Sequence, residues 1–151
     1  MNRDELLKTA ADLRQVTKPV AVEYANKSGT IVSQMNLVML ERNDIKELVG
    51  EQNLDMMKDN HANHARFISS ILAHFNAEVL VETVLWVFRA YRSRGFSTTY
   101  WSALLNTWVE VMKKELSDEA FTQVYPYYYW MLVNIPVFVK MTDDRILPVN
   151  N

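Results

Sequence analysis

The chain has 151 residues, a length that favours a single domain with its own core. Sixteen basic and eighteen acidic residues give a formal net charge of −2, and they are scattered along the chain, so we expect neither a nucleic-acid-binding surface nor a polybasic membrane anchor. The absence of cysteine excludes disulfides, thiolate metal sites and a cysteine nucleophile, and it fits a reducing compartment.

The sequence predicts an all-α protein. Only three glycines and four prolines occur, and apolar residues recur at steps of three and four rather than two. The charged start MNRDELLKTAADLRQ contains no apolar run of signal-peptide length, so we expect a cytoplasmic protein. Helices are predicted at about 3–16, 19–41, 44–58, 51–75, 77–94, 98–115 and 118–141, where 51–75 continues the helix before it or bends away from it.

The helix predicted over 51–75 carries two histidines, His61 and His64, within an apolar stripe. The stripe keeps to steps of three and four, so both histidines point toward the core or a cavity in it: Leu54, Met57, His61, His64, Ile68, Ile71 and Phe75. They are either partly buried histidines bonded to neighbouring helix ends or the wall of a pocket that Tyr91 faces. Two histidines supply only two ligands and no Glu-x-x-His arrangement is present, so no protein-only metal site is predicted.

The helix predicted over 77–94 is apolar on nearly all sides, which is typical of a helix in the middle of a bundle. Asn76 is a candidate N-cap for it. Gly95 is expected to end it in the left-handed conformation, and the aromatic residues on both sides of this glycine are expected to fill the corner between two helices.

The last two predicted helices, 98–115 and 118–141, carry more aromatic surface than one monomer core is expected to bury. The run YPYYYWM at 125–131 places side chains on every side of its helix, and Trp108 adds to them. The uncharged stretch 120–139 contains two prolines and several polar residues, so we interpret it as a core and interface helix and not as a membrane span. The sequence therefore predicts a homodimer with an interface built from Trp108, Met112, Tyr125, Tyr128, Tyr129 and Leu132.

No catalytic signature occurs in the chain. It has no glycine-rich phosphate loop, no G-x-S-x-G elbow and no H-E-x-x-H motif. We therefore do not expect an enzyme.

From Asp59, the stretch DNHANHARFISSILAHFNAEVLVETVLWVFRAYRSRGFSTTYW resembles the layout of the globin-coupled sensor family. That layout has a buried helix, a histidine four residues before a glycine, and an aromatic pair opening the next helix. Here the glycine is Gly95, the aromatic pair is Tyr100 and Trp101, and the family's proximal histidine position falls on Tyr91. Without that histidine the layout is also similar to the amino-terminal domains of stressosome co-antagonist proteins, which are globin-folded sensors without haem.

The resemblance implies a globin-like bundle of about six to seven helices in one domain, with N-terminal helices over 1–58, the matching segment over 59–141 and a tail over 142–151. It implies a sensing or regulatory domain without cofactor whose last two helices form a dimer bundle and which acts on an output domain or partner protein. The implied pocket is lined by His61, His64, Phe67, Ile68, Trp86, Tyr91 and Trp101. Two alternatives stay open: a haem-binding gas sensor with Tyr91 or His64 as axial ligand, and a purely structural dimerisation module.

Overall fold

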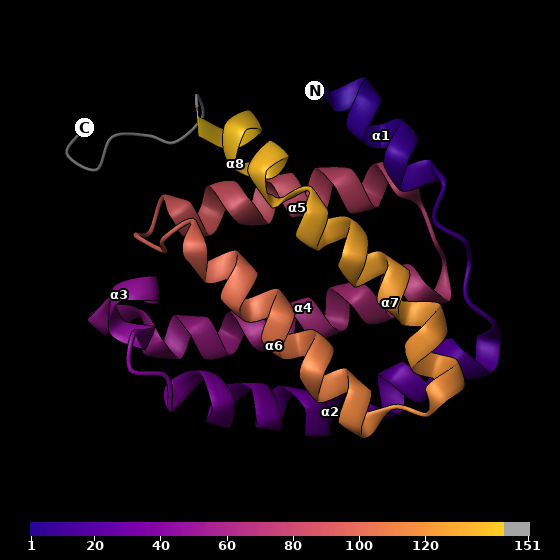
Figure 1. The fold of residues 1–151 in the computed structure, drawn as a ribbon, viewed down its shortest axis with the longest axis horizontal. Helices are drawn as coiled ribbons and strands as arrows, with labels where there is room; N and C mark the ends of the chain where they lie inside the picture. The colour runs from indigo at the N-terminus through magenta and orange to yellow at the C-terminus, as the bar shows by residue number, and fades with distance from the viewer. Residues whose placement is uncertain (144–151) are drawn as a thin grey trace.

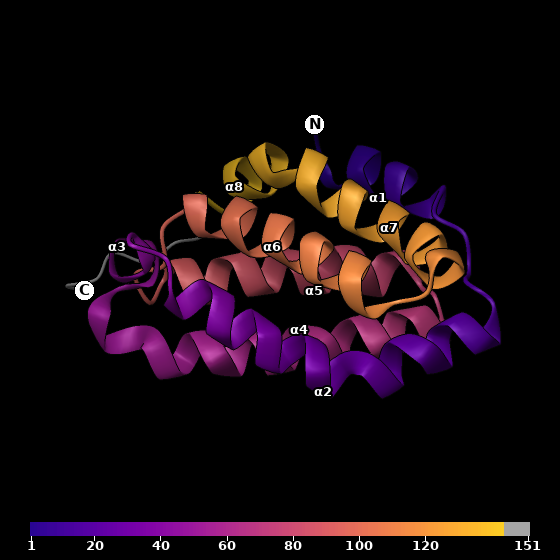
Figure 2. The same cartoon turned by 60° about the horizontal axis from the view of Figure 1, so that its bottom comes forward.

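The computed structural model describes residues 1–143, and this part of the chain is all-α, as predicted, with no strand (Figure 1). The helices are α1 (Arg3–Ala11), α2 (Lys18–Leu40), α3 (Ile45–Val49), α4 (Leu54–Ala73), α5 (Ala77–Arg92), α6 (Thr99–Glu115), α7 (Asp118–Val133) and α8 (Ile135–Asp143), with a 3-10 turn at Glu51–Asn53. Figure 2 shows α2 and α4 side by side in one layer, α5 and α6 in the next, and α1, α7 and α8 on top. The elements therefore stack in three layers, and α5 and α6 occupy the middle one.

Two predicted helix starts rest on side-chain caps. The Asn76 Oδ1 atom accepts a hydrogen bond from the Val79 backbone N–H at 3.0 Å, and the Ser117 Oγ atom accepts one from the Ala120 N–H at 3.2 Å. Each cap satisfies a donor that the first helical turn leaves without an intrahelical partner. These local signals fix where α5 and α7 begin.

Other predicted boundaries were wrong. The first helix ends at Ala11 and not near residue 16, and the helix expected over 44–58 is instead the short α3, which Gly50 ends at φ +91°, followed by the 3-10 turn. The helix expected over 118–141 is interrupted at Asn134, and Pro136 lies in the first turn of α8, where its missing N–H costs nothing. Residues 142 and 143 of the expected tail belong to α8, and 144–151 lie outside the described residues.

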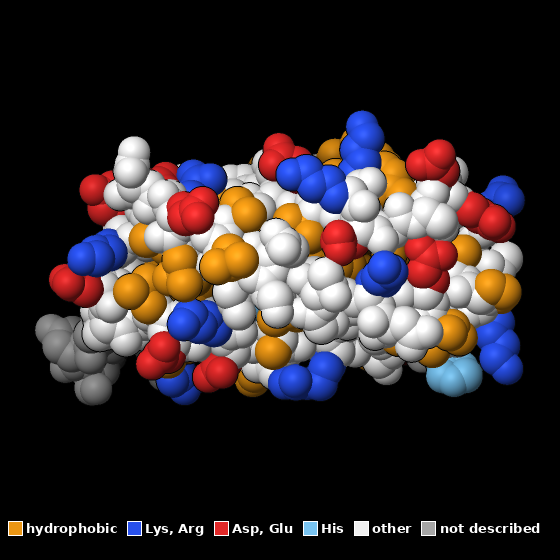
Figure 3. Space-filling view, turned by 90° about the horizontal axis from the view of Figure 1, so that it is seen from below, with side chains coloured by type: hydrophobic (Ala, Val, Ile, Leu, Met, Phe, Trp, Pro, Cys, Tyr) orange, Lys and Arg blue, Asp and Glu red, His pale blue; other side chains and the backbone are white. Residues whose placement is uncertain are grey.

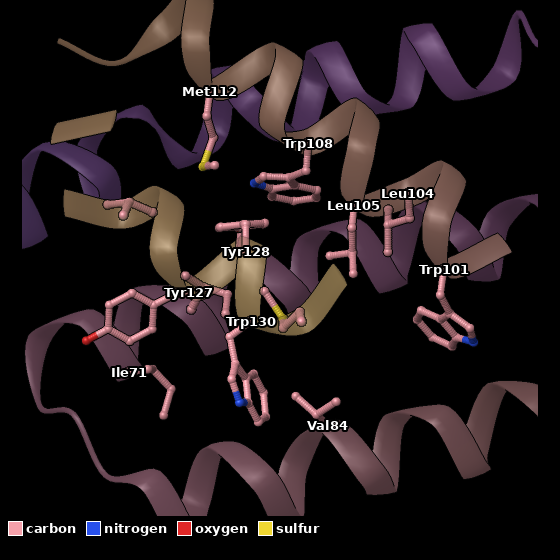
Figure 4. Close-up of a cluster of buried hydrophobic side chains, with 14 of the residues drawn as sticks. Ile71, Val84, Trp101, Leu104, Leu105, Trp108, Met112, Tyr127, Tyr128 and Trp130 are labelled. Carbon is pink, nitrogen blue, oxygen red and sulfur yellow. The ribbon is translucent and has the colours of Figure 1, made fainter. Parts of the chain in front are cut away.

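The N-terminal helices belong to the same apolar core as the rest of the chain. Leu6 of α1, Tyr24 and Met35 of α2, and Trp108 of α6 are all fully buried in one cluster. Figure 4 shows part of this core, in which side chains of α6 and α7 lie above those of α4 and α5. Residues 1–58 are therefore not an appendage to the segment 59–141.

Helix α5 is not buried on all sides, contrary to the sequence prediction. Val79 is 47% exposed and Trp86 is 60% exposed. The buried residues of α5 lie on its other side: Leu80, Val81, Val84, Leu85 and Phe88. The upper layer covers α5 only in part, through contacts with α1 and α8. One apolar face of α5 is thus left at the surface.

The molecular surface carries charges of both signs. Figure 3 shows acidic and basic side chains interspersed over the face seen from below, with apolar side chains between them. Among residues 1–143, no helix combines the length and the apolar character that a membrane crossing requires.

Gly95 and Gly29 offer a matched pair of alanine substitutions with opposite expected signs. Gly95 has φ +100° and ends α5, where the Phe96 N–H donates to the Tyr91 carbonyl at 3.1 Å, whereas Gly29 lies within helix α2. An added Cβ meets no atom within 4 Å at either position, so only the backbone decides. We expect Gly95→Ala to cost about 1–2 kcal/mol and Gly29→Ala to stabilise by about 0.5–1 kcal/mol in urea unfolding. Effects of the same sign would contradict the left-handed helix end.

Candidate functional site

A cavity of about 350 Å³ lies between α4, α5 and α6, and Met131 of α7 also contributes to its wall. In Figure 4, Trp101, Leu104 and Leu105 of α6 lie on one side of this region and Val84 of α5 lies opposite them. None of the residues in the wall is an Asp, Glu, Lys or Arg. The cavity wall is therefore uncharged, and it reaches the surface at Trp86, which is 60% exposed.

Most of the predicted pocket residues meet at this cavity. His64, Phe67, Trp86, Tyr91 and Trp101 line it. His61 and Ile68 do not: both are buried on the side of α4 that packs toward α2. The structure therefore brings together five members of the predicted set and leaves two in the core.

An aromatic corner joins the end of α5 to the start of α6. Trp101 stacks on Phe88 with ring centroids 4.3 Å apart, and Tyr91 packs edge-on against Phe96 at 5.0 Å and Trp101 at 6.0 Å. Such contacts add to the stabilisation that comes from burying the rings. The corner holds Tyr91 and Trp101 at the cavity wall.

His64 does not hydrogen-bond to Tyr91, which the sequence predicts on one reading to face both histidines across a pocket. The His64 Nε2 atom is hydrogen-bonded to the Tyr128 hydroxyl at 2.8 Å, and that hydroxyl is in turn 2.7 Å from the hydroxyl of Tyr24. The Tyr91 hydroxyl makes no side-chain hydrogen bond within residues 1–143 and its ring is only half-buried. The fully buried Tyr128 therefore reaches His64 from α7 and is its hydrogen-bond partner.

Both α4 histidines are held neutral by burial. The His61 Nδ1 atom is 2.6 Å from Asn36 Oδ1, and because this oxygen can only accept, Nδ1 carries the proton. Burial lowers the pKa of His61 to about 4. Burial, with a smaller contribution from the charge of His61, lowers the pKa of His64 to about 3. Near pH 7 both imidazoles are therefore neutral, and that of His64 is the one at the cavity wall.

The geometry does not suit haem ligation by the predicted residues. The Nε2 atom of His64 is already bonded to Tyr128, and a tyrosinate ligand at Tyr91 would need a cation beside it. Arg92, which follows Tyr91 in the sequence, instead donates to the Val139 carbonyl and the Thr142 hydroxyl, at 3.0 and 2.9 Å, and pairs with Asp143. Within the described part of the chain, no group of three or more His, Asp or Glu side chains is placed to hold a metal ion.

Three of the six residues predicted for the dimer interface face the core of the chain and not its surface. Trp108, Met112 and Tyr128 are fully buried in the chain's own core, whereas Tyr129 is 54% exposed and Tyr125 and Leu132 are partly exposed. The reason is that α7 packs against both α6 and α2, while α1 and the segment that follows it each receive one further side chain of the aromatic run. Tyr127 donates to the Arg14 carbonyl at 2.6 Å, and Trp130 donates to Thr9 Oγ1 at 2.9 Å.

The sequence did not lead us to predict Asn60 as a cavity residue or Tyr100 as its hydrogen-bond partner. Asn60 lines the cavity and is 3% exposed, and its Oδ1 atom accepts a hydrogen bond at 2.7 Å from the hydroxyl of the fully buried Tyr100. A signal was present, because Asn60 precedes His64 by four residues and so shares its helix face. The polar part of the cavity is therefore larger than a single histidine.

Comparison with protein-family models, curated proteins and solved structures finds no match for this chain. The features that bear on its function are the cavity, the buried hydrogen bonds beside it and the exposed apolar surface.

Proposed function

We propose that this chain is a non-haem sensory or regulatory domain that binds a small, largely apolar molecule in the cavity between α4, α5 and α6. The observation that carries the proposal is the cavity itself: about 350 Å³, walled mainly by aromatic and aliphatic side chains with a few polar groups. Ligand sites for small molecules have this size and this mixture of walls.

The chemistry of the wall favours binding over catalysis. It contains no carboxylate, lysine or cysteine, and the single histidine in it has its Nε2 atom bonded to Tyr128. A general base needs a free nitrogen or oxygen within reach of the proton that it removes. Recognition of an uncharged molecule is the task for which these side chains are suited.

The proposal includes a globin-like arrangement of the middle helices. It is supported by the end of α5, where Tyr91 lies four residues before Gly95 and contributes to the cavity wall, with His64 of α4 in the wall as well. In this arrangement Tyr91 replaces a ligating histidine, and an apolar ligand occupies the space that a cofactor would otherwise take.

Helix α7 links the cavity to a surface. Met131 lies in the cavity wall, while Tyr129 and Val133 of the same helix are 54% and 52% exposed. A ligand that displaces Met131 would therefore shift a face on which a second copy or an output partner can dock. If α7 acts only as a structural dimerisation surface, oligomeric state will not respond to any ligand of the cavity.

Filling the cavity is expected to abolish binding of an apolar probe while leaving the fold intact. Naphthalene, at several times its Kd, should raise the thermal midpoint of the wild type by about 2–4 °C. Val87 lies half-buried in the cavity wall, so Val87→Trp places an indole in that space, and the increase should disappear. Val79→Trp is the matched control, because Val79 is exposed on the same helix outside the cavity, and it should retain the increase. An unchanged midpoint in the wild type would contradict the proposal.

A further inference from the structure

We infer that the ligand of this cavity is a neutral molecule with an apolar body and a carbonyl or similar hydrogen-bond acceptor, held by the Asn60 amide nitrogen and the His64 Nδ1 atom. The inference rests on the proposed function and adds to it the chemical class of the ligand.

Asn60 supplies the first donor. Its Oδ1 atom accepts from the Tyr100 hydroxyl, which fixes the amide with its NH₂ group as the remaining polar end. That group has no hydrogen-bond partner among residues 1–143; Asn60 is 3% exposed as a residue and lines the cavity, and its Nδ2 atom is not sealed from that cavity. Buried amide donors are normally paired, so an acceptor within the cavity is the partner that this geometry calls for.

His64 supplies the second donor, because the hydroxyl network fixes its tautomer. The hydroxyls of Tyr24 and Tyr128 are 2.7 Å apart, and Tyr24 has no other acceptor among the described residues, so its proton points to Tyr128. The proton of Tyr128 is then directed to His64 Nε2, 2.8 Å away. An imidazole that accepts at Nε2 and is neutral carries its proton on Nδ1. The Nδ1 atom has no partner within residues 1–143 and is not sealed from the cavity it borders.

The two donors share one face of α4. Asn60 and His64 are separated by four residues, so their Cβ atoms lie about one helical turn apart, at roughly 5–6 Å. A carbonyl oxygen has two lone pairs and can accept from both donors. The opposite wall is formed by Val84, Leu104 and Leu105, which offer no polar side chain and suit an apolar body.

The uncharged wall and the volume of the cavity further restrict the chemical class of the ligand. A carboxylate in this cavity would be buried without a cation, because no Lys or Arg lines it and protonation of His64 is opposed by burial. Benzene occupies an apolar protein cavity of about 150 Å³, so a cavity of about 350 Å³ corresponds to roughly fourteen heavy atoms. An aryl ketone has this size and this polarity.

Three probes of similar size separate the possibilities. Benzophenone carries the acceptor, diphenylmethane is its hydrocarbon counterpart, and 2-naphthoate carries a negative charge. Binding of each to the full ¹⁵N-labelled chain is measured by NMR titration. We expect benzophenone to bind about tenfold more tightly than diphenylmethane, which corresponds to two modest neutral hydrogen bonds, and 2-naphthoate to bind more weakly than benzophenone.

A double variant tests which residues provide the preference. Asn60→Leu alone would strand the Tyr100 hydroxyl, so it is combined with Tyr100→Phe, which removes both partners of that bond. The preference for benzophenone should fall to about threefold or less in the double variant, in which His64 is the only one of the two proposed donors left. It should be unchanged in Asn106→Leu, which alters an exposed asparagine of α6 outside the cavity. The imidazole ¹⁵N shifts of His64 should report a proton on Nδ1 in the wild type.

The possible outcomes separately test the donor pair, the neutral class of the ligand and the proposed function. Equal binding of benzophenone and diphenylmethane, a full preference in the double variant, or a proton on His64 Nε2 would overturn the donor pair while leaving a ligand-binding cavity. Tighter binding of 2-naphthoate than of benzophenone would overturn the neutral class. Failure of all three probes to shift any cavity resonance would contradict the proposed function itself.

Discussion

Replacing Trp108 by glutamate is expected to unfold the protein and not merely to separate two copies of it. Trp108 is fully buried, its ring lies edge-on to His64 at 4.4 Å, and it stacks on Tyr128 at 6.5 Å. Loss of such an indole costs about 3–5 kcal/mol, and an unpaired carboxylate in the same place adds several more. Because a domain of this size has about 5–15 kcal/mol in total, circular dichroism should show an unfolded or barely folded chain.

Tyr129→Glu is the matched control for this substitution. Tyr129 lies on α7 and is 54% exposed, so its carboxylate would remain hydrated and the free energy of unfolding should change by less than about 0.5 kcal/mol. If α7 forms the proposed dimer face, light scattering of Tyr129→Glu should show a lower mass than the wild type. A folded Trp108→Glu variant with reduced mass would instead return Trp108 to a surface and overturn the core described here.

Acidification from pH 7 to pH 5 is expected to remove about 2–4 kcal/mol of stability through His61 and His64. Their pKa values in the folded chain are about 4 and about 3, below the value of about 6.5 for a free histidine. The unfolded chain therefore binds protons that the folded chain does not, so stability falls as the pH drops below 6.5 and this loss levels off near the folded pKa values. Each histidine accounts for up to about 2 kcal/mol at pH 5, and the contribution of His64 is smaller because this residue is only partly buried.

Urea unfolding at pH 7, 6 and 5 measures this loss, and His61→Gln isolates one half of it. The glutamine keeps a donor for Asn36 Oδ1 but does not titrate in this range, so the variant should lose about half as much free energy as the wild type between pH 7 and 5. The same pH dependence in the wild type and in His61→Gln would show that His61 ionises freely in the folded chain.

The sequence was sufficient to locate the cavity approximately, because helical periodicity is a local property. On α4, successive residues are 100° apart, so Asn60, Asn63, His64 and Phe67 cover one sector and line the cavity. His61 and Ile68 lie further round the same helix, facing the core, although their spacing from His64 also fits steps of three and four. A stripe with this spacing is wide enough to contact more than one neighbouring helix. Only the packing of α2 against α4 shows which of its residues face the core and which line the cavity.

The aromatic surface of α7 could not be assigned from sequence in the same way. The run 125–131 is too apolar for a helix with one buried face. Whether helices of the same chain or a second copy cover its other faces depends on tertiary packing, which the sequence pattern does not show. In the structure α7 crosses α6 and α2, so Tyr127, Tyr128 and Trp130 are buried within one chain. The helix also breaks at Asn134, and α8 packs against α5. Asn134 and Pro136 mark this break in the sequence, but it was not predicted because apolar residues continue on both sides of it.

A crystal structure of the protein under xenon pressure would show whether the cavity can hold a ligand, since xenon enters apolar protein cavities without needing a hydrogen-bond partner. We expect xenon density between α4, α5 and α6, in contact with Phe67, Val84 and Leu105. Side chains that fill this space, with no xenon bound among them, would contradict the existence of the ligand site.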